Sequence, residues 1–458
     1  MGKTIAIVGG GLAGCECALT LADAGIAVRL FEQKPAVHSA AHVSPLLAEL
    51  VCSNSLRSFE LTSGVGLLKQ EMLDLHSHCM AAALLARVPA DKALAVDRSH
   101  FSRILTEEIA ASPHIHRVER CIRSLEDPCL WEEDIAAVVL ATGPLTHDDL
   151  ASSLAQTIGE ESCYFYDAIA PIVWTHSLDH TVVFRASRYE CREADFDCSK
   201  GKGDYLNCPM NQEEYERFYN ALSTAKTVPS KDFEQLKHFE GCMPIEALAE
   251  RGASTLTFGP LKPVGFIDPR TGKRPYAVLQ LRAETCSGET CNLVGCQTRM
   301  LHAEQERVFR LVPGMEQAEF ARLGSMHRNT FVHAPTVLDP DLSLKANPHI
   351  FLAGQITGVE GYVESAACGL WLGYSLRALL GGGTLPKPPT QTALGALLGH
   401  LERKDSPFQP SNINFGLMPP LEERTRKSDR KAAYTVRART AFQQWYQENT
   451  KYLKKEDI

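Results

Sequence analysis

Two cysteines lie among small and polar residues, where a thiol can react. Cys52 is part of AELVCSNSLRS (48–58), close to Arg57, and Cys242 is part of FEGCMPIE (239–246), just before a helix predicted from Pro244. A thiolate is the form that adds to an electrophilic carbon, and nearby cations or a helix N-terminus favour that form. The pattern therefore indicates nucleophilic chemistry at these thiols, with two packed structural thiols as the alternative.

A glycine-rich turn near the N-terminus has the residues that bind a dinucleotide. It follows an apolar run, Thr4 to Val8, and opens a helical stretch from Gly14 to Gly25. In a G-x-G-x-x-G turn the first glycine permits the tight turn, the second lets the backbone approach a pyrophosphate, and the third lets helix and strand pack closely. The predicted cofactor-binding residues of this turn are Gly9, Gly10, Gly11, Leu12, Ala13 and Gly14.

Glu32 completes this fingerprint. It ends a second apolar run, Ala27 to Phe31, and lies 18 residues after Gly14. An acid at this place binds the ribose hydroxyls of adenosine, and the pyrophosphate is expected at the free N–H groups of the helix N-terminus. The alternative is a surface glycine turn, and the strand, helix and acid together argue against it.

Two later segments extend the predicted cofactor site. The apolar run Ile135 to Leu140 ends in a small-residue turn with Thr142 and Gly143, which brings backbone close to a dinucleotide. A second glycine segment begins at Phe351. The residues predicted to contact the cofactor there are Gly354, Gln355, Gly358, Gly361 and Tyr362. Together the segments predict one flavin, FAD, held from both ends.

These elements predict an α/β fold. A Rossmann-type, glutathione-reductase-like FAD-binding domain would comprise residues 1–159 and 331–386, with an inserted α+β substrate domain at 160–330. The insert has no second G-x-G-x-x-G turn, so no separate nicotinamide domain is expected. A strand from His349 to Ala353 and a helix from Val363 to Leu380 return the chain to the first domain. Residues 387–458 would form a linker, a short helix and a basic helical tail.

The composition of the 458 residues is typical of a cytoplasmic enzyme with two or three domains. No apolar run approaches the ~18 residues of a membrane span, and Met1 leads into the first strand without a signal peptide. The odd count of 15 cysteines suggests reduced thiols. Cys286, Cys291 and Cys296 form no C-x-x-C pair, so we expect no metal site.

The net charge of −8 does not indicate a nucleic-acid partner, but its distribution is uneven. From Leu421 to Ile458 ten Lys/Arg face six Asp/Glu, a local charge of +4. The basic residues that interleave with aromatic ones are Arg424, Arg426, Lys427, Arg430, Lys431, Arg437 and Arg439. The pattern suits a helix that contacts RNA phosphates, and equally a solvated helix docked on the body of the protein.

The motifs as a set closely resemble one flavoprotein family. They are Gly9-x-Gly11-x-x-Gly14, AELVCSNSLRS (48–58), ALAVDR (93–98), ATGPLT (141–146), YFYDAIAPIV (164–173), YLNCPM (205–210), FEGCMPIE (239–246), GKRPYAVLQLR (272–282), MHRNTF (326–331) and FLAGQITGVEGYVESAA (351–367). The set resembles the folate- and FAD-dependent tRNA (uracil-5-)-methyltransferase family, TrmFO, from the first strand to about Leu380. The last segment also occurs in the related GidA/MnmG enzymes, which are longer.

The resemblance implies methylation of a uridine at carbon 5 in the T-loop of tRNA. Methylenetetrahydrofolate would donate the one-carbon unit through reduced FAD, and NADH or NADPH would supply electrons. Carbon 5 of uracil becomes nucleophilic once a thiolate adds at carbon 6. By correspondence with the family motifs Cys242 is the candidate nucleophile, and Cys52 is the candidate base for the carbon 5 proton or a guard of the flavin adduct. Ser53 and Asn54 are predicted to contact the cofactor.

For the folate, the resemblance suggests a wall made by the segments at 272–282 and 326–331. Arg282 and Arg328 would pair with folate carboxylates or substrate phosphates, and His327 would offer a flat face to the pterin. Asn329 is a further candidate. Each of these residues alone also suits a purely structural role.

Two other interpretations remain open at this stage. A close relative with the same motifs would methylate a ribosomal RNA uridine, because flavin and cysteine motifs act only after the base has been extruded. In the second interpretation the chain is a flavin-bearing RNA-binding protein, related to GidA/MnmG, that does not methylate RNA. The sequence does not indicate the oligomeric state or the preference between NADH and NADPH.

Overall fold

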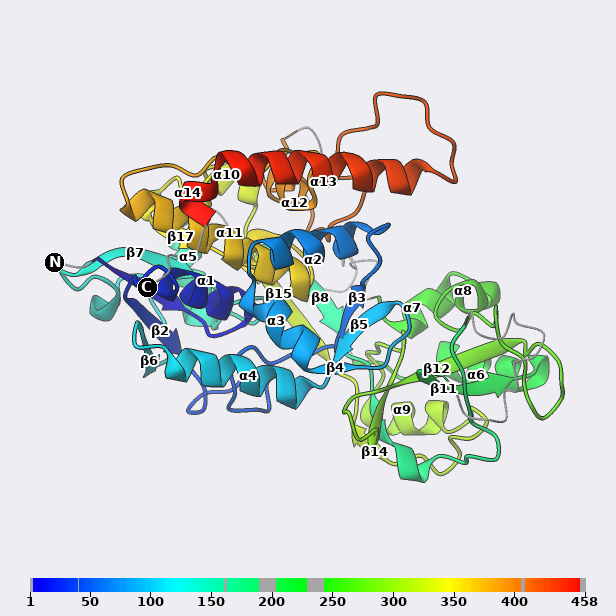
Figure 1. Cartoon of the computed structure of the whole chain (residues 1–458). Helices are drawn as coiled ribbons and strands as arrows, with labels where there is room; N and C mark the ends of the chain where they lie inside the picture. The colour runs from blue at the N-terminus through cyan, green and yellow to red at the C-terminus, as the bar shows by residue number, and fades with distance from the viewer. Residues whose placement is uncertain are drawn as a thin grey trace.

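The computed structural model describes residues 3–39, 41–159, 163–188, 203–228, 243–404 and 408–453 (Figure 1). Cys242 and the three residues before it in its motif (239–241) therefore lie outside the described residues. Within the described residues, no helix is long and apolar enough to cross a membrane.

A doubly wound sheet forms the centre of the first domain. Its order is β16, β17, β7, β1, β2, β6, and every neighbouring pair is parallel except β16 with β17. The strands are β1 (Thr4–Val8), β2 (Val28–Glu32), β6 (Ile115–Glu119), β7 (Ile135–Leu140), β16 (Ser343–Leu344) and β17 (Asn347–Leu352). All five residues of β1 are buried, as expected of a central parallel strand. The turns after β1, β7 and β17 meet at one edge of the sheet because parallel strands end on the same side.

Helices pack against this sheet and against one another. They are α1 (Leu12–Ala22), α2 (Gly64–Asp74), α3 (His78–Leu85), α4 (Arg98–Ala111), α5 (Asp148–Ile158), α10 (Ala334–Val337) and α11 (Tyr362–Leu380), with 3-10 turns η1 (Pro128–Leu130) and η7 (Gln355–Thr357). A small sheet of β3 (Ser55–Ser58), β4 (Arg87–Val88) and β5 (Ala93–Val96) lies beside them. Helices α1 and α11 pack so closely that a Cβ on Gly369 would collide with the carbonyl of Ala13.

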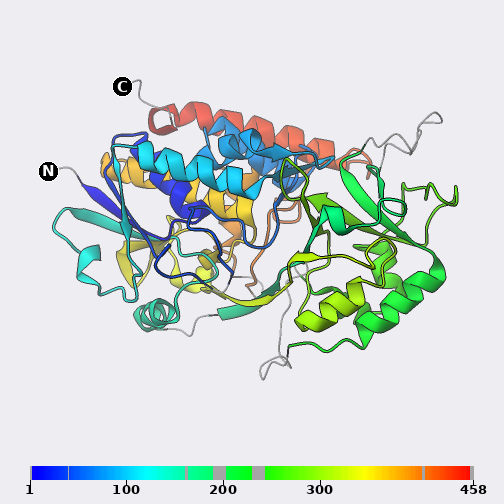
Figure 2. The same cartoon turned by 90° about the horizontal axis from the view of Figure 1, so that it is seen from below.

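A second sheet of order β10, β11, β12, β13, β9, β14 has its own hydrophobic core. Its strands are β9 (Ile172–Trp174), β10 (Phe184–Arg185), β11 (Tyr205–Met210), β12 (Ala277–Ala283), β13 (Thr290–Leu293) and β14 (Phe320–Arg322), and η2 (Thr175–Ser177), α6 (Gln212–Ser223), α7 (Ile245–Glu250), α8 (Ala253–Phe258) and α9 (His302–Phe309) accompany it. Figure 2 shows this inserted part, in green, beside the first domain.

The two segments that connect the first domain to the inserted part pair with each other as a two-stranded antiparallel sheet. β8 (Cys163–Ala168) pairs antiparallel with β15 (Met326–Phe331), so the chain leaves and returns along the same path. The chain ends in α12 (Ala393–His400), α13 (Arg430–Glu448) and α14 (Thr450–Leu453). In Figure 1, α13 lies along the outer side of α11 and α12.

The fold agrees with the predicted class. The predicted first strand coincides with β1, and the predicted helix at 363–380 begins one residue earlier, at Tyr362. The short helix predicted after the linker is α12, and it begins after Thr392, which caps it by accepting a hydrogen bond from the Gly395 N–H. The division at residues 160, 330 and 386 stays a prediction.

Candidate functional site

A cavity of about 440 Å³ opens at the edge of the first sheet where β1, β7 and β17 end. Backbone from all three turns lines it. The predicted site residues that line the cavity are Gly9, Gly10, Gly11, Leu12, Ala13, Glu32, Cys52, Ser53, Thr142, Gly143, Asn329, Gly354, Gln355, Gly361 and Tyr362. Segments more than 300 residues apart in sequence thus form one site.

The turn after β1 has the geometry that a bound pyrophosphate requires. Gly9 has a φ of +107°, which favours glycine, and a Cβ at Gly14 would collide with the carbonyl oxygen of Gly9. Gly11 differs from both, because the nearest protein atom to its Cβ would be the Ala141 oxygen, 4.0 Å away. A side chain at Gly11 is therefore accepted by the protein but would project toward the cavity. Gly14 serves helix packing and does not line the cavity.

The first turn of α1 offers free N–H groups to the cavity. Gly11 is its N-cap and provides no side-chain cap, while Leu12 and Ala13 line the cavity. Such an uncapped helix N-terminus favours an anion. Nearby, one carboxylate oxygen of Glu32 accepts the Gly10 N–H at 2.7 Å and the other accepts the Lys34 N–H at 2.9 Å. Both contacts fix the acid beside the glycine turn.

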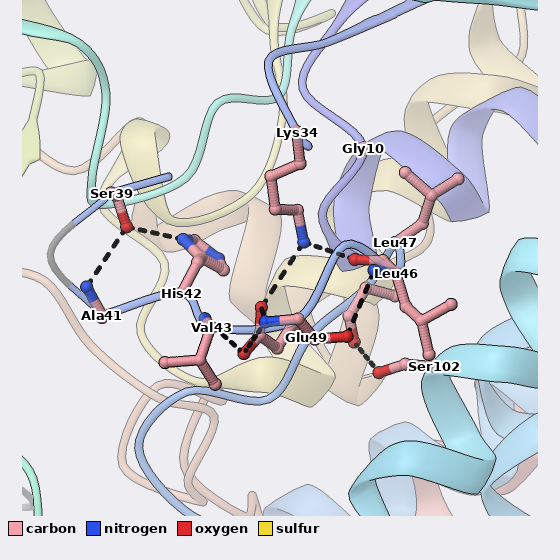
Figure 3. A network of polar contacts seen from close by, with 12 residues as sticks. Gly10, Lys34, Ser39, Ala41, His42, Val43, Leu46, Leu47, Glu49 and Ser102 are labelled. Carbon is pink, nitrogen blue, oxygen red and sulfur yellow. Dashed lines mark hydrogen bonds and ion pairs between the residues drawn. The ribbon is translucent and has the colours of Figure 1, made fainter. Parts of the chain in front are cut away.

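A buried polar network closes the same end of the cavity, and sequence reasoning missed it. Figure 3 shows Lys34 directed toward the Leu46 carbonyl and Glu49, whose carboxylate also accepts the Val43 N–H at 3.0 Å. The Lys34 Nζ lies 3.5 Å from Glu49, and both side chains are nearly buried. Burial, and then the charge of Lys34, lower the pKa of His42. Lys34, His42 and Glu49 all line the cavity, and their only sequence signal is polarity after the second strand.

Cys52 lies at the cavity, half-buried, on the loop before β3. Its N–H donates to the Tyr362 hydroxyl at 2.7 Å, and its thiol donates to the Ala168 carbonyl over 3.7 Å. The loop thus contacts the start of α11 and the end of β8. Burial, and then the neighbouring Cys52, raise the pKa of Tyr362 far above its usual range, so the hydroxyl stays protonated.

Arginines from different elements hold the Cys52 loop. Arg98 donates to the Leu50 carbonyl at 2.9 Å, and its Nε lies 2.6 Å from Glu284. Arg322 donates to the Val51 carbonyl at 3.3 Å. Arg98 belongs to the first domain, whereas Glu284 and Arg322 belong to the inserted part, so these contacts fix the loop between the two.

Arg282 and Asn54 do not line the cavity. Arg282 is only 6% exposed and donates to Asn54 Oδ1 at 2.7 Å and Ser53 Oγ at 2.8 Å. Its guanidinium therefore makes its described contacts within the protein, whereas the sequence suggested that it binds a folate carboxylate or a substrate phosphate. Gly358 is also away from the cavity, where the Phe408 ring packs against it.

Asn329, one of the predicted folate or substrate ligands, lies on β15 and lines the cavity. It is 2% exposed, and its side-chain Nδ2 has no hydrogen-bond partner among the described residues. A buried amide without a partner is costly, so this donor suits an acceptor on a bound molecule. The side chains of His327 and Arg328 lie outside the described part of the structure, as does Cys242. α7 begins at Ile245 with Pro244 as its N-cap, close to the predicted helix start.

The C-terminal part of the chain contributes to the cavity, which the sequence did not suggest. Asn412 lines it, and the Ile413 N–H donates to Glu364 at 3.0 Å. The same Glu364 carboxylate pairs with Arg57, another lining residue. Its second oxygen is buried and has no partner in the described chain. Glu364, which pairs with Arg57, thus anchors the late segment at the cavity.

The tail helix α13 is docked on the first domain. Trp445 donates to the Pro386 carbonyl at 2.9 Å, Arg439 pairs with Asp74, and Arg437 donates to the carbonyls of Pro419 and Pro420. Two of the predicted RNA-facing cations are therefore used internally. The other five predicted cations are exposed: Arg424, Arg426, Lys427, Arg430 and Lys431.

Among the described residues there is no group of three or more His, Cys, Asp or Glu that could hold a metal ion. Of the regularly spaced cysteines, Cys286 is exposed while Cys291 and Cys296 are buried. Burial raises the pKa of both buried thiols, which keeps them protonated.

The doubly wound sheet, the glycine turn and the cavity define a dinucleotide-binding protein of the Rossmann class. A family model described as "Glucose inhibited division protein A" matches residues 4–382. Relatives named methylenetetrahydrofolate–tRNA-(uracil-5-)-methyltransferase TrmFO are 60% identical in Nitratidesulfovibrio vulgaris, covering 97% of this chain and 92% of the relative, and 53% identical in Geobacter sulfurreducens, covering 97% and 99%. The chain therefore belongs to the glucose inhibited division protein A family, among the members named TrmFO.

Solved structures support the fold. Aquifex aeolicus GidA in its form II crystal has a TM-score of 0.68 to this chain at 13% identity, covering 99% of this chain and 75% of that one. The form I crystal gives a TM-score of 0.67, with 99% and 78% covered. At this identity the similarity concerns the fold alone.

Proposed function

We propose that this protein methylates carbon 5 of a uridine in tRNA, taking the one-carbon unit from methylenetetrahydrofolate, with FAD as cofactor. The names of its relatives support the donor and the tRNA substrate. One observation carries the proposal on the structural side. The cavity that suits a dinucleotide also contains a half-buried thiol, Cys52, and a buried donor without a partner among the described residues, Asn329.

The residues present fit FAD. The free N–H groups at Leu12 and Ala13 suit its pyrophosphate, and Glu32 suits the adenosine ribose. Gly354 is suited to close approach because its φ is +79° and a Cβ there would lie 2.8 Å from that of Ala13. When bound, FAD supplies the one-carbon carrier and hydride chemistry that side chains lack.

The thiols carry the chemistry on the uridine. In this proposal the Cys242 thiolate forms a bond to carbon 6 and pushes electrons to carbon 5, which then attacks the one-carbon unit. The Cys52 thiolate takes the carbon 5 proton, and the electron pair of that C–H bond forms an exocyclic methylene as the bond between the one-carbon unit and its carrier breaks. A hydride then adds to the methylene carbon, the double bond moves to carbons 5 and 6, and the Cys242 thiolate leaves carbon 6. The Tyr362 hydroxyl and the arginines around Val51 hold the Cys52 loop at the cavity.

NADH or NADPH is the proposed reductant, because net methylation from a methylene donor consumes two electrons. Both nucleotides, like tRNA, are available in the cytoplasm, where we place the protein. Asn329 is the proposed donor to the folate or the uridine, with Arg328 and His327 as further candidates on the same strand.

The test is to incubate the protein with unmodified tRNA transcript, methylenetetrahydrofolate and NADH or NADPH, and to measure 5-methyluridine. We expect product only with all components, none from Cys52→Ala, and full activity from the matched control Cys286→Ala, an exposed thiol. Product on a ribosomal RNA fragment but not on tRNA would identify ribosomal RNA as the substrate. Absence of product on either RNA, with FAD bound, would refute the methyltransferase.

A second experiment separates the two thiols. A transcript containing 5-fluorouridine blocks loss of the carbon 5 substituent and so traps the thioether at carbon 6. We expect no covalent adduct from Cys242→Ala and an adduct from Cys52→Ala. The reverse outcome would exchange the roles of the two thiols. Adducts and normal turnover from both variants would show that both thiols are structural.

A further inference from the structure

One corner of the inserted domain is basic although the chain is acidic overall. From Arg251 to Tyr276 five Lys/Arg accompany a single acid, Asp268, whereas the whole chain has a net charge of −8. The lone acid is 4% exposed and is used within the segment, where it pairs with Arg270 at 2.9 Å. The other cations of the segment, which have no acidic partner within the described residues, are Arg251, Lys262, Lys273 and Arg274.

The same corner carries the most exposed large apolar side chain of the described chain. Phe258, the last residue of α8, is 81% exposed, and Tyr276, just before β12, is 43% exposed. Exposed aromatic rings beside unpaired cations are the combination by which proteins stack unpaired bases and neutralise phosphates.

Backbone contacts hold these residues together. The turn after α8 is tied to β12, since the Val278 N–H donates to the Leu261 carbonyl at 3.0 Å. The hairpin that presents Lys273 is closed by the Asp268 N–H, which donates to the Lys273 carbonyl at 2.9 Å. These contacts tie the segment between α8 and β12 to the inserted sheet and close its hairpin.

We propose that this corner, which we call the basic corner (Arg251, Phe258, Lys262, Lys273, Arg274 and Tyr276), is an RNA-docking surface of the enzyme. The inference rests on the proposed function and adds where the tRNA is held. Lys273, Arg274 and Lys262 neutralise phosphates, and Phe258 stacks on an unpaired base.

The basic corner is distant from the cavity. β12 joins the two places, because Tyr276 precedes it and Arg282, near its other end, contacts Ser53. Six residues of extended strand span about 20 Å. RNA contacts at that distance change how tightly the substrate is held and leave the reacting atoms untouched. The variants below should therefore raise the KM for tRNA and leave kcat unchanged.

The first part of the test measures the affinity for unmodified tRNA transcript between about 50 and 200 mM salt, without folate or reductant. In this range the affinity falls with salt in proportion to the number of phosphates that the protein neutralises. Replacing Lys273 and Arg274 together by Ala should flatten the slope of log affinity against log salt by about 1.4–1.8, since each phosphate that is no longer neutralised contributes about 0.7–0.9. The matched control replaces Lys3 and Arg103, exposed cations of the first domain, by Ala. A slope equal to that of the control would overturn the proposal.

The second part concerns the ring of Phe258. Phe258→Leu should weaken tRNA binding about fivefold or more, whereas Phe258→Tyr should bind like the wild type, because stacking needs a ring. Equal binding by the Leu variant would show that the ring does not stack on the RNA and would overturn the stacking assignment. Unchanged flavin content and thermal unfolding verify that the variants are folded.

The outcomes separate this inference from the proposed function. A protein whose salt slope depends on Lys273 and Arg274 but that makes no 5-methyluridine supports the surface and refutes the methyltransferase. A protein that methylates tRNA with a slope unaffected by these residues refutes the surface and supports the methyltransferase.

Discussion

Arg282 and Asn54, 228 residues apart in sequence, are joined by a hydrogen bond of 2.7 Å from Nε to Oδ1. The Asn54 amide in turn donates to the Ala283 carbonyl at 2.8 Å. Both side chains are buried, so the pair links the central strand of the inserted sheet to the loop that carries Cys52. The position of the thiol therefore depends on how the inserted domain is seated.

We expect the pair to be energetically coupled. Arg282→Met leaves Asn54 and Ser53 without their donor and should lower the free energy of unfolding by about 2–3 kcal/mol. In a double-mutant cycle with Asn54→Ala, denaturant unfolding should give a coupling energy of about 1 kcal/mol or more. Arg251→Met, at an exposed arginine of the same domain, is the control. Additive effects of the two substitutions would contradict the coupling.

Gly11→Leu should yield a folded protein without its flavin. The protein leaves room for a side chain at Gly11, but that side chain occupies the place of the pyrophosphate. The ratio of flavin to protein absorbance measures the effect, and Gly399→Ala on α12 should retain full flavin. Full flavin content in Gly11→Leu would place the cofactor elsewhere.

Asn329→Leu should separate stability from binding. Because Nδ2 has no partner among the described residues, an apolar side chain of similar size should leave the ligand-free protein as stable or more stable. The KM for methylenetetrahydrofolate or for tRNA should rise about 2- to 13-fold, the equivalent of one hydrogen bond. Lower stability with unchanged kinetics would make Asn329 a structural residue.

Lys69 should give the protein a characteristic pH dependence. Its Nζ donates to the Ser58 carbonyl at 2.6 Å, and burial, then the charge of Arg57, lower its pKa from 10.5 to about 7. Between these values the unfolded chain holds a proton that the folded protein has released, so the free energy of unfolding rises with pH. From about pH 7 to 9 the wild type should gain about 2 kcal/mol relative to Lys69→Met.

Denaturant unfolding at several pH values measures this gain, with Lys3→Met as the control at an exposed lysine. Parallel curves for the wild type and Lys69→Met would show that Lys69 titrates as an ordinary lysine.

The exposed cations before and at the start of α13 are the second place to seek RNA contacts. Charge reversal of Arg424, Arg426 and Lys427 should flatten the salt dependence of tRNA binding by about 0.7–0.9 for each phosphate that these residues neutralise. Flavin content should stay the same. An unchanged slope would leave α13 as a docked helix only.

The dinucleotide end of the site was predictable because its signals are local. A strand, a glycine turn and a helix follow one another within 22 residues, and Glu32 follows at the end of the next strand. The later segments were predictable for a related reason. They end strands of the same parallel sheet, and such ends meet at one edge.

The rest depends on tertiary contacts that sequence spacing does not encode. Arg282 resembles a ligand on an exposed strand until the inserted sheet pairs it with Asn54. Lys34 and Glu49 meet only when their loop folds back over Gly10. The tail cations Arg437 and Arg439 are indistinguishable in sequence from their exposed neighbours, and only the docking of α13 directs them inward.

The contribution of Asn412 to the cavity has a consequence for biosynthesis. The glycine turn at Gly9 to Gly14 is translated well before this wall, which follows residue 411. A nascent chain that has folded its first strands still has an open cavity, with Glu364 lacking its contact to Ile413. This wall of the cavity is therefore complete only when the segment at Asn412 and Ile413 has been translated and has folded back onto Glu364.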